Sequence, residues 1–132
     1  MKIGMVLEGG AMRGMYTAGV LDVFLDKDVK VDGIIGVAAG VIFGDNYCSK
    51  QRGRALRYNK RFCKDKNYMS LYSLIKTGNL VNKQFAFYDV LMIHDVFDTK
   101  EYKKSKTKFY ATVTNVKTGL AEYIELDDII AQ

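Results

Sequence analysis

The chain has 132 residues, a formal net charge of +5 and 48% hydrophobic residues. A chain of this length can bury about two thirds of its unfolded surface in one core. We therefore expect a single domain over residues 1–132. The hydrophobic and charged fractions are those of a globular protein, which excludes disordered and fibrous classes. The positive charge favours anionic partners without selecting lipid over nucleic acid.

Two short apolar runs indicate where in the cell the protein is expected to be found. The run that starts at Ile3 ends at Glu8, which is too short for a signal peptide, and the run over 33–44 is shorter than the ~20 residues of a membrane span. A cytoplasmic chain is therefore expected. Cys48 and Cys63 show no CxxC spacing and are expected to be reduced thiols, and His94 has no second ligand nearby. We expect no metal and no cofactor.

The first third of the chain reads as a strand, a helix and a second strand. Residues 3–7 form an almost continuous apolar run, which predicts a strand buried on both faces of a parallel sheet. Residues 32–37 predict a second buried strand, so the opening is a βαβ unit with a right-handed crossover. Between them, helical spacing predicts a buried face made by Met12, Met15, Tyr16, Gly19, Val20, Val23 and Phe24. The opposite face should carry Asp22, Asp26 and Lys27.

Later segments extend this pattern. A second helix is expected from Ala39, a basic helix over 50–66, and short helices or loop over 69–88. Residues 109–115 are rich in β-branched and aromatic side chains and predict a strand. A turn at 117–119 then predicts a hairpin with 122–124. Alternating strands and helices indicate an α/β fold with a mainly parallel sheet.

A glycine-rich loop over 9–14 follows the first strand and opens the first helix. Such a loop exposes backbone N–H groups and can hold an anion. A Rossmann fingerprint requires glycine where Ala11 stands, and its ribose-binding acid belongs at the end of the second strand, whereas Asp32 begins it. A Walker loop requires Lys and Ser or Thr where Met15 and Tyr16 stand. Of the anions considered, the transient oxyanion of acyl transfer is the remaining candidate ligand for this loop. The alternative is that the loop is a tight turn without a ligand.

The segment Gly36–Gly40 (Gly-Val-Ala-Ala-Gly) lies at the second strand-to-helix junction. It matches the nucleophile elbow G-x-S-x-G except that alanine replaces the serine. A structural alternative is that Gly36, Gly40 and Gly44 only let a helix pack closely on the sheet. The two motifs together are more specific, because they place an oxyanion loop and an elbow at the carboxyl edge of neighbouring strands.

A G-G-x-x-R-G-like loop followed by such an elbow resembles the patatin-like phospholipases, in particular a bacterial branch. The helix over 15–23, the basic stretch around Arg57 and the strand ending at Thr114-Asn115 also resemble that family, from about Ile3 to Glu125. The resemblance implies a three-layer α/β sandwich with a mainly parallel central sheet. It also implies a lipid or acyl-ester substrate and a lipid acyl hydrolase that uses a Ser–Asp dyad without histidine.

Carried over residue by residue, the resemblance makes Ala38 the nucleophile position. The other matching residues are the elbow residues Gly36, Val37, Ala39 and Gly40, and the oxyanion residues Gly9, Gly10, Ala11, Arg13 and Gly14. Ala11 replaces the family's usual second glycine. The direction in which one backbone N–H group of the loop points is therefore expected to differ from the family pattern.

Two departures predict an inactive chain. Ala38 has no hydroxyl, and the family's D-G-[G/A] aspartate motif is absent, since the chain ends at Gln132 before that motif is expected. The Asp32-Gly33 pair begins the same strand and should lie roughly 20 Å from the elbow. Cys48 and Ser49 are expected to be ordinary helix-end residues. The sequence therefore indicates a truncated, catalytically dead family member, whether engineered or natural.

Basic residues at Lys50, Arg54, Arg57, Arg61 and Lys64 recur at helical spacing and predict one charged stripe. The stripe is either a solvated face or a peripheral contact with anionic membrane lipid, through Arg54, Arg57, Arg61 and Lys64. Nucleic acid is not expected, since no recognition motif accompanies the charge. The alternative function is a non-catalytic α/β module that binds phosphate, another anion or a lipid headgroup.

Overall fold

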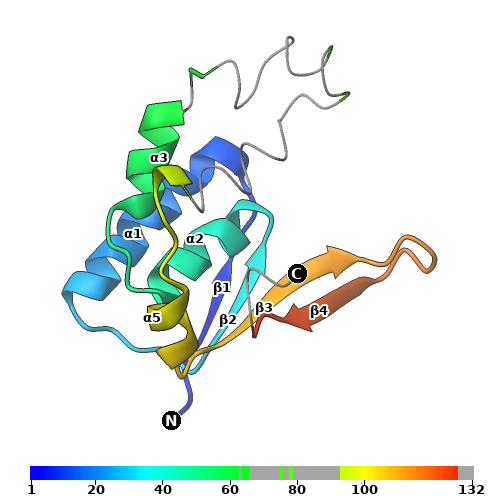
Figure 1. The fold of residues 1–132 in the computed structure, drawn as a ribbon. Coiled ribbons are helices and arrows are strands. Elements are labelled where there is room, and N and C mark those ends of the chain that lie inside the picture. The colour runs from blue at the N-terminus through cyan, green and yellow to red at the C-terminus, as the bar shows by residue number, and fades with distance from the viewer. Residues whose placement is uncertain (63, 66–74, 76–77, 79–92, 128–132) are drawn as a thin grey trace. The chain divides into compact units, whose positions relative to one another are not determined.

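The computed structural model of the chain describes residues 1–62, 64–65, 75, 78 and 93–127 (Figure 1). They form two compact units. The sheet unit comprises Met1–Gly53 and Asp98–Gln132, and the small unit comprises Arg54–Phe97. Most of 69–88 and Cys63 lie outside the described residues, so their predictions stay predictions.

The sheet unit contains a four-stranded sheet of order β1-β2-β3-β4. The strands are β1 (Gly4–Leu7), β2 (Gly33–Val37), β3 (Lys108–Thr114) and β4 (Ala121–Glu125). β1, β2 and β3 are parallel, and β4 runs antiparallel to β3. The predicted βαβ opening and late hairpin are therefore confirmed, as is a mixed α/β fold with a mainly parallel sheet.

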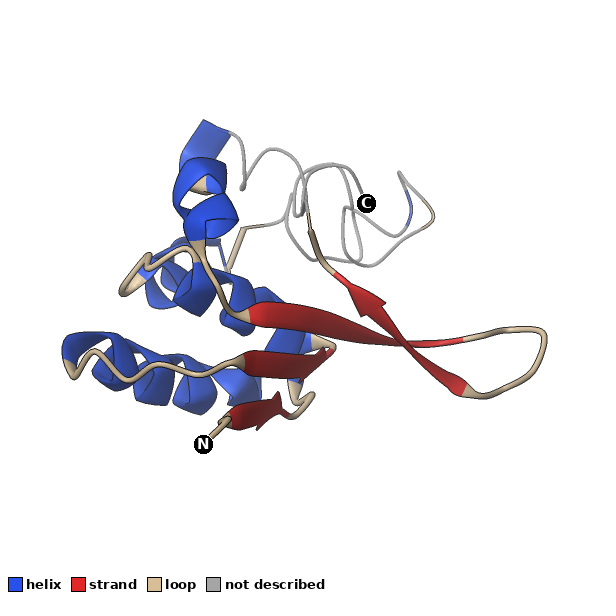
Figure 2. Ribbon diagram, turned by 90° about the horizontal axis from the view of Figure 1, so that it is seen from below, coloured by secondary structure: helices blue, strands red, loops and turns tan. Residues whose placement is uncertain are grey.

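The β3–β4 hairpin extends past the ends of β1 and β2 (Figure 2). Its connecting turn is held by Asn115, whose Oδ1 accepts hydrogen bonds from the backbone N–H groups of Lys117 and Thr118 at 2.9 and 3.2 Å. The Asn115 side-chain amide donates to Glu122 at 2.7 Å. Gly119 adopts φ 71°, which glycine tolerates without steric cost. The sequence thus builds a defined turn rather than a loose loop.

The helices of the sheet unit are the 3-10 helix η1 (Ala11–Gly14), α1 (Met15–Asp26), α2 (Ala39–Cys48) and α5 (Thr99–Lys104). α2 packs on β1, β2 and β3, and α1 packs on α2. Leu7, Ile34, Phe43 and Phe109 are buried in the resulting core.

The prediction that the first strand is buried on both faces is wrong. Leu7 is buried, but its neighbour Val6 is 74% exposed. Side chains alternate between the two faces of a strand, and α2 covers the face that carries Leu7. No described residue encloses Val6 on the other face.

The predicted buried face of the first helix is also wrong. Tyr16 is 82% exposed and Val23 is 51% exposed, whereas Ala18 and Leu21 are buried. The reason is close packing: a methyl group built on Gly14 would lie 2.3 Å from the Phe43 ring. Gly14, Ala18 and Leu21 therefore lie on the buried side of η1 and α1, and Tyr16 and Val23 point outward.

The predicted polar face of α1 makes defined contacts. Asp22 is half-buried and accepts a hydrogen bond from the Gly53 backbone N–H at 2.9 Å. Asp26 accepts two hydrogen bonds from Arg52, at 2.6 and 2.9 Å. The side chain of Arg52 lowers the pKa of the Asp26 carboxyl. These contacts join the end of α1 to the segment that follows α2.

The small unit contains α3 (Arg54–Phe62), which is shorter than the helix predicted over 50–66. Lys50 has φ 54° and belongs to the sheet unit, where it pairs with Glu101 at 3.1 Å. Within the described part of the chain, no helix is both long and apolar enough to cross a membrane.

The contact between α2 and β1 predicts that alanine substitution has opposite effects on stability at two glycines. A methyl group on Gly40 would lie 2.3 Å from the Leu7 carbonyl oxygen, whereas one on Gly19, within α1, would meet nothing within 4 Å. Gly40→Ala should lower the free energy of unfolding by roughly 1–3 kcal/mol or more, because backbone must shift. Gly19→Ala, the matched control, should raise it by about 0.5–1 kcal/mol through helix propensity. Urea denaturation of both variants checks this, and equal stabilities would contradict the packing described.

Candidate active site

Ala38 has a backbone conformation that alanine rarely adopts. Its φ is 47° and its ψ is −117°, and it caps the amino end of α2 directly after β2. Positive φ in a non-glycine residue carries steric strain and persists only when the surroundings impose it. The structure therefore contains a strained strand-to-helix turn at the predicted nucleophile position.

The glycines on either side of Ala38 permit this turn. A methyl group on Gly36 would lie 2.8 Å from the backbone nitrogen of Val41, and one on Gly40 would lie 2.3 Å from the Leu7 carbonyl oxygen. Gly44 packs against Phe109, whose ring would lie 2.7 Å from an added methyl group. The three glycines thus let α2 pack closely on the sheet, and the same close packing produces the strained turn at Ala38.

The glycine loop lies against the elbow. A methyl group built on Gly9 would be 3.3 Å from the Ala38 Cβ and 3.3 Å from the Val37 carbonyl oxygen. At its other end, Gly14 packs on Phe43 and Ala39 of α2. The sequence placed both motifs at one edge of the sheet, and the structure packs Gly9 so closely on Val37 and Ala38 that a side chain at position 9 would meet both.

Ala11 keeps a glycine-like backbone. Its φ is 47°, in the left-handed region that glycine adopts readily. The Arg13 backbone N–H donates to the Gly10 carbonyl at 3.0 Å, and the Arg13 side chain lies alongside Gly10 and is exposed. The replacement of glycine by alanine has therefore not moved this residue into an ordinary helical or extended conformation.

Two helices begin at the site, and each supplies backbone donors. The first N–H groups of a helix have no partner within that helix. η1 begins at Ala11 and α2 at Ala39, the residues that follow Gly10 and Ala38. Helix amino ends also carry a partial positive charge. The arrangement can therefore hold a negatively charged oxygen near position 38.

Asp32 lies at the other end of β2. Its Oδ2 accepts a hydrogen bond from the Ile3 backbone N–H at 2.7 Å, and its own N–H donates to the Ile3 carbonyl at 2.8 Å. The carboxylate thus ties β1 to β2 at their amino ends. The expectation that Asp32 cannot act at the elbow agrees with this position.

Cys48 and Ser49 end α2, as predicted. Both are buried, and the Ser49 hydroxyl donates to the Asn46 carbonyl at 3.3 Å. Burial raises the pKa of the Cys48 thiol to about 12. A neutral, enclosed thiol is a poor nucleophile.

The predicted lipid-contact stripe is corrected at Arg54. This side chain is completely buried, donates to the Asp95 backbone carbonyl at 2.9 and 2.6 Å, and lies over the rings of Tyr58 and Phe97. Helical spacing did not reveal this, because Asp95 is distant in sequence and no motif marks it. Arg54 therefore cannot reach a lipid headgroup.

The remaining members of the stripe differ in their contacts. Arg57 is bound to the Asp95 carboxylate at 3.1 Å. Arg61 is exposed and donates to the His94 carbonyl at 3.4 Å, and Lys64 is exposed. Only part of the predicted stripe is therefore available to solvent.

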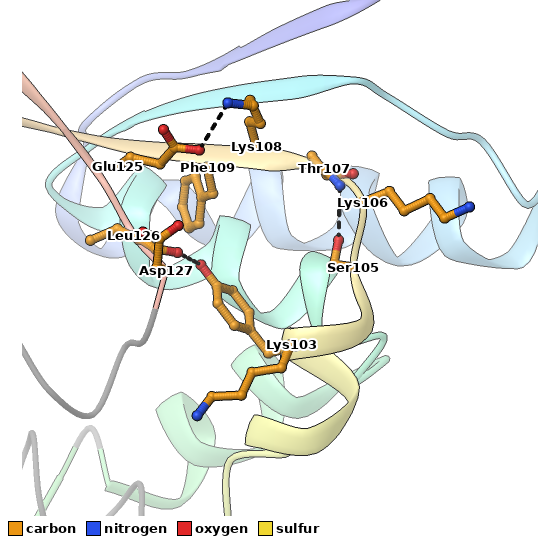
Figure 3. Close-up of a pocket in the computed structure, with 10 residues that line it drawn as sticks. Lys103, Ser105, Lys106, Thr107, Lys108, Phe109, Glu125, Leu126 and Asp127 are labelled. Carbon is orange, nitrogen blue, oxygen red and sulfur yellow. Dashed lines mark hydrogen bonds and ion pairs between the residues drawn. The ribbon is translucent and has the colours of Figure 1, made fainter.

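A shallow hollow of about 190 Å³ lies elsewhere in the sheet unit, between α5 and the strands β3 and β4 (Figure 3). It opens at the amino end of β3, where Lys108 pairs with Glu125 at 3.3 Å. Tyr102 donates to the Leu126 carbonyl at 2.7 Å across it. None of the predicted site residues lines this hollow. Over the described ranges, no cluster of His, Cys, Asp and Glu could hold a metal ion.

The strain at Ala38 predicts that glycine is the more stable residue there. Ala38→Gly should raise the free energy of unfolding by about 1 kcal/mol, since strain relief exceeds the entropic cost of glycine. Ala39→Gly, the matched control at the buried first position of α2, should lower it. Urea denaturation measures both. A loss of stability in Ala38→Gly would show that the turn is unstrained.

Comparison with known proteins agrees with this geometry. A family model described as patatin-like phospholipase matches residues 5–122. The uncharacterized protein YjjU of Escherichia coli is 30% identical over 82 residues, which are 61% of this chain and 23% of that protein. A putative patatin-like phospholipase domain-containing protein of Caenorhabditis elegans, M110.7, is 29% identical over 100 residues, 71% of this chain and 9% of that protein. The chain thus spans less than a quarter of these relatives. Since the family model covers most of it, the chain belongs to the patatin-like phospholipase family.

Proposed function

We propose that this chain carries the oxyanion loop and the nucleophile elbow of a lipid acyl hydrolase, with alanine at the position where a serine would attack. The observation that carries the proposal is the strained backbone of Ala38, at φ 47° and ψ −117°, in contact with Gly9 of the glycine loop. Strained backbone of this kind clusters at active sites and ligand-binding sites. The substrate class, by family, is a lipid or other acyl ester.

With a serine at position 38, each group would have a definite part. The hydroxyl oxygen would attack the acyl carbonyl, and an aspartate base would take its proton. The N–H groups at the starts of η1 and α2 would hold the oxyanion. Collapse of the tetrahedral intermediate would expel the alcohol, which takes up the proton from the aspartate, and leave the acyl group on the serine. Water would then hydrolyse this acyl-enzyme and release the acid.

The alanine removes the first of these steps. A methyl group cannot form an acyl-enzyme, so the oxyanion donors have no tetrahedral intermediate to stabilise. The sequence also contains no Asp-Gly-Gly or Asp-Gly-Ala segment to supply the base. We therefore infer that this chain does not hydrolyse esters as it stands.

A fluorophosphonate probe tests the assignment of position 38. The chain itself should not be labelled, and Ala38→Ser alone should give little hydrolysis, since an unassisted hydroxyl is a weak nucleophile. Ala38→Ser in a chimera that carries the carboxyl part of an active family member should be labelled at Ser and hydrolyse a short-chain ester. Ala39→Ser in the same chimera is the matched control and should do neither.

Two results would contradict the assignment. Labelling of the unmodified chain would place a nucleophile elsewhere. Comparable hydrolysis by Ala38→Ser with and without the added segment would mean that a carboxylate of this chain, such as the exposed Glu8 beside Gly9, serves as the base.

The alternative is a non-catalytic module that uses the same N–H groups to bind an anion. The absence of a nucleophile at Ala38 favours it, because donors at helix amino ends bind phosphate without any further group. If it holds, inorganic phosphate or glycerophosphate should raise the melting temperature. Gly9→Val, which introduces a side chain against Ala38, should abolish the shift, whereas Gly19→Ala should preserve it. A shift that survives Gly9→Val would place the anion elsewhere.

A further inference from the structure

β4 lies at the end of the sheet, and among the described residues no strand pairs with its outer edge. Its register with β3 is continuous, without a bulge. Tyr123 is 60% exposed and Ile124 is 42% exposed. Because neighbouring side chains point to opposite faces of a strand, these values show that both faces of β4 are open. Figure 2 shows the β3–β4 hairpin projecting past the ends of β1 and β2.

The hydrogen bonds between β3 and β4 determine which backbone groups of β4 point outward. The Leu126 N–H donates to the Phe109 carbonyl at 2.8 Å, and the Asn115 N–H donates to the Leu120 carbonyl at 2.9 Å. Hydrogen-bonded pairs alternate along an antiparallel ladder, so every second residue of β4 directs its backbone groups to β3. The residues between them direct their N–H and carbonyl groups to the outer edge, and these are Ala121, Tyr123 and Glu125.

The usual protection of an edge strand is missing from β4. Sheet edges are commonly protected against further pairing by lysine, proline, a bulge or unpaired charges. β4 contains no lysine, and the chain contains no proline. Both carboxylates of β4 are bound within the chain, since Glu122 accepts a hydrogen bond from Asn115 at 2.7 Å and Glu125 pairs with Lys108 at 3.3 Å. The outer edge is therefore open to another strand.

The sequence of β4 is complementary to itself in one antiparallel register. When a twofold axis perpendicular to the sheet passes through Tyr123, this residue faces its own copy and Ala121 faces Glu125, so that all outward backbone groups are paired. Glu122 then faces Ile124. No like charges lie directly opposite each other, an arrangement that would destabilise a sheet. An axis at Glu122 would oppose two carboxylates, and an axis at Ile124 would leave Ala121 without a partner in β4.

We propose that the chain forms a twofold dimer in which β4 pairs antiparallel with β4 of a second copy, with Tyr123 at the axis. The self-complementary register identifies a second copy as the partner. A twofold pair closes on itself, whereas pairing of β4 with β1 of another copy would continue into an open filament. Pairing along a five-residue strand buries little surface, so the dimer is weak and depends on concentration. The inference goes beyond the proposed function and does not rest on it, because β4 contains none of the candidate site residues.

Sedimentation equilibrium of the full chain tests the pairing. The chain should pass from monomer to dimer as its concentration rises, without larger species. Tyr123→Lys should abolish the dimer, because it places two ammonium groups opposite each other at the axis. Tyr16→Lys is the matched control, since Tyr16 is 82% exposed on α1, and it should dimerise like the parent chain. A chain that stays monomeric at every concentration, or a dimer that survives Tyr123→Lys, overturns the proposal.

A mixture of the Tyr123→Lys and Tyr123→Glu chains tests the register. Each variant alone should be monomeric, because like charges meet at the axis. An equimolar mixture should form a heterodimer, because opposite charges then face each other. This result would also show that both variants are folded. A mixture that stays monomeric overturns the pairing of position 123 with itself, and species larger than a dimer overturn the twofold arrangement.

Tyr123→Pro separates backbone pairing from side-chain contact. The Tyr123 N–H points away from β3, so proline removes no hydrogen bond of the hairpin but removes one donor of the outer edge in each copy. Dimerisation should weaken at least about tenfold. Tyr123→Phe keeps the donor and the ring, and it should dimerise like the parent chain. Circular dichroism should show that both variants keep the parent's fold, and a folded Tyr123→Pro chain that dimerises as strongly as the parent overturns strand pairing.

Discussion

The sheet unit depends on the direct contact of α2 with the backbones of β1 and β2. Side chains are missing where the helix and strands meet, at Gly36 and Gly40, so that an added methyl group would lie 2.8 Å from Val41 and 2.3 Å from the Leu7 carbonyl. Because the interior is close-packed, this distance admits no side chain. The chain between β2 and α2 therefore has to turn within one residue, and that residue, Ala38, adopts a positive φ. The elbow is thus a consequence of packing.

The same constraint assembles the rest of the candidate site. A helix this close to the sheet brings Ala39 and Phe43 against Gly14, and Ala38 against Gly9. The loop after β1 and the turn after β2 then meet with their helix amino ends at one edge. Strain of this kind costs of order 1–3 kcal/mol and is usually found at functional sites.

The outward side chains follow from the same contact. Since Gly14, Ala18 and Leu21 take the buried side of η1 and α1, Met12 and Tyr16 are left in solvent. Val6 is exposed on the face of β1 that α2 does not cover. The elbow and the amino ends of η1 and α2 lie at the carboxyl edge of the parallel strands, where ligands of open α/β sheets bind.

The sequence by itself determined the strand–helix–strand opening, the late hairpin, the α/β class, the two glycine motifs and their common edge, because strand periodicity, turn chemistry and glycine spacing are local properties. It did not determine which face of α1 is buried, since helical spacing marks an apolar stripe but not the small residues that a close helix contact selects. It also misread Arg54 as part of a surface stripe, because the partner that buries it, Asp95, is joined to it only by folding. The strain at Ala38 and its contact with Gly9 were decided by tertiary structure alone, since they arise where segments distant in sequence pack without side chains between them.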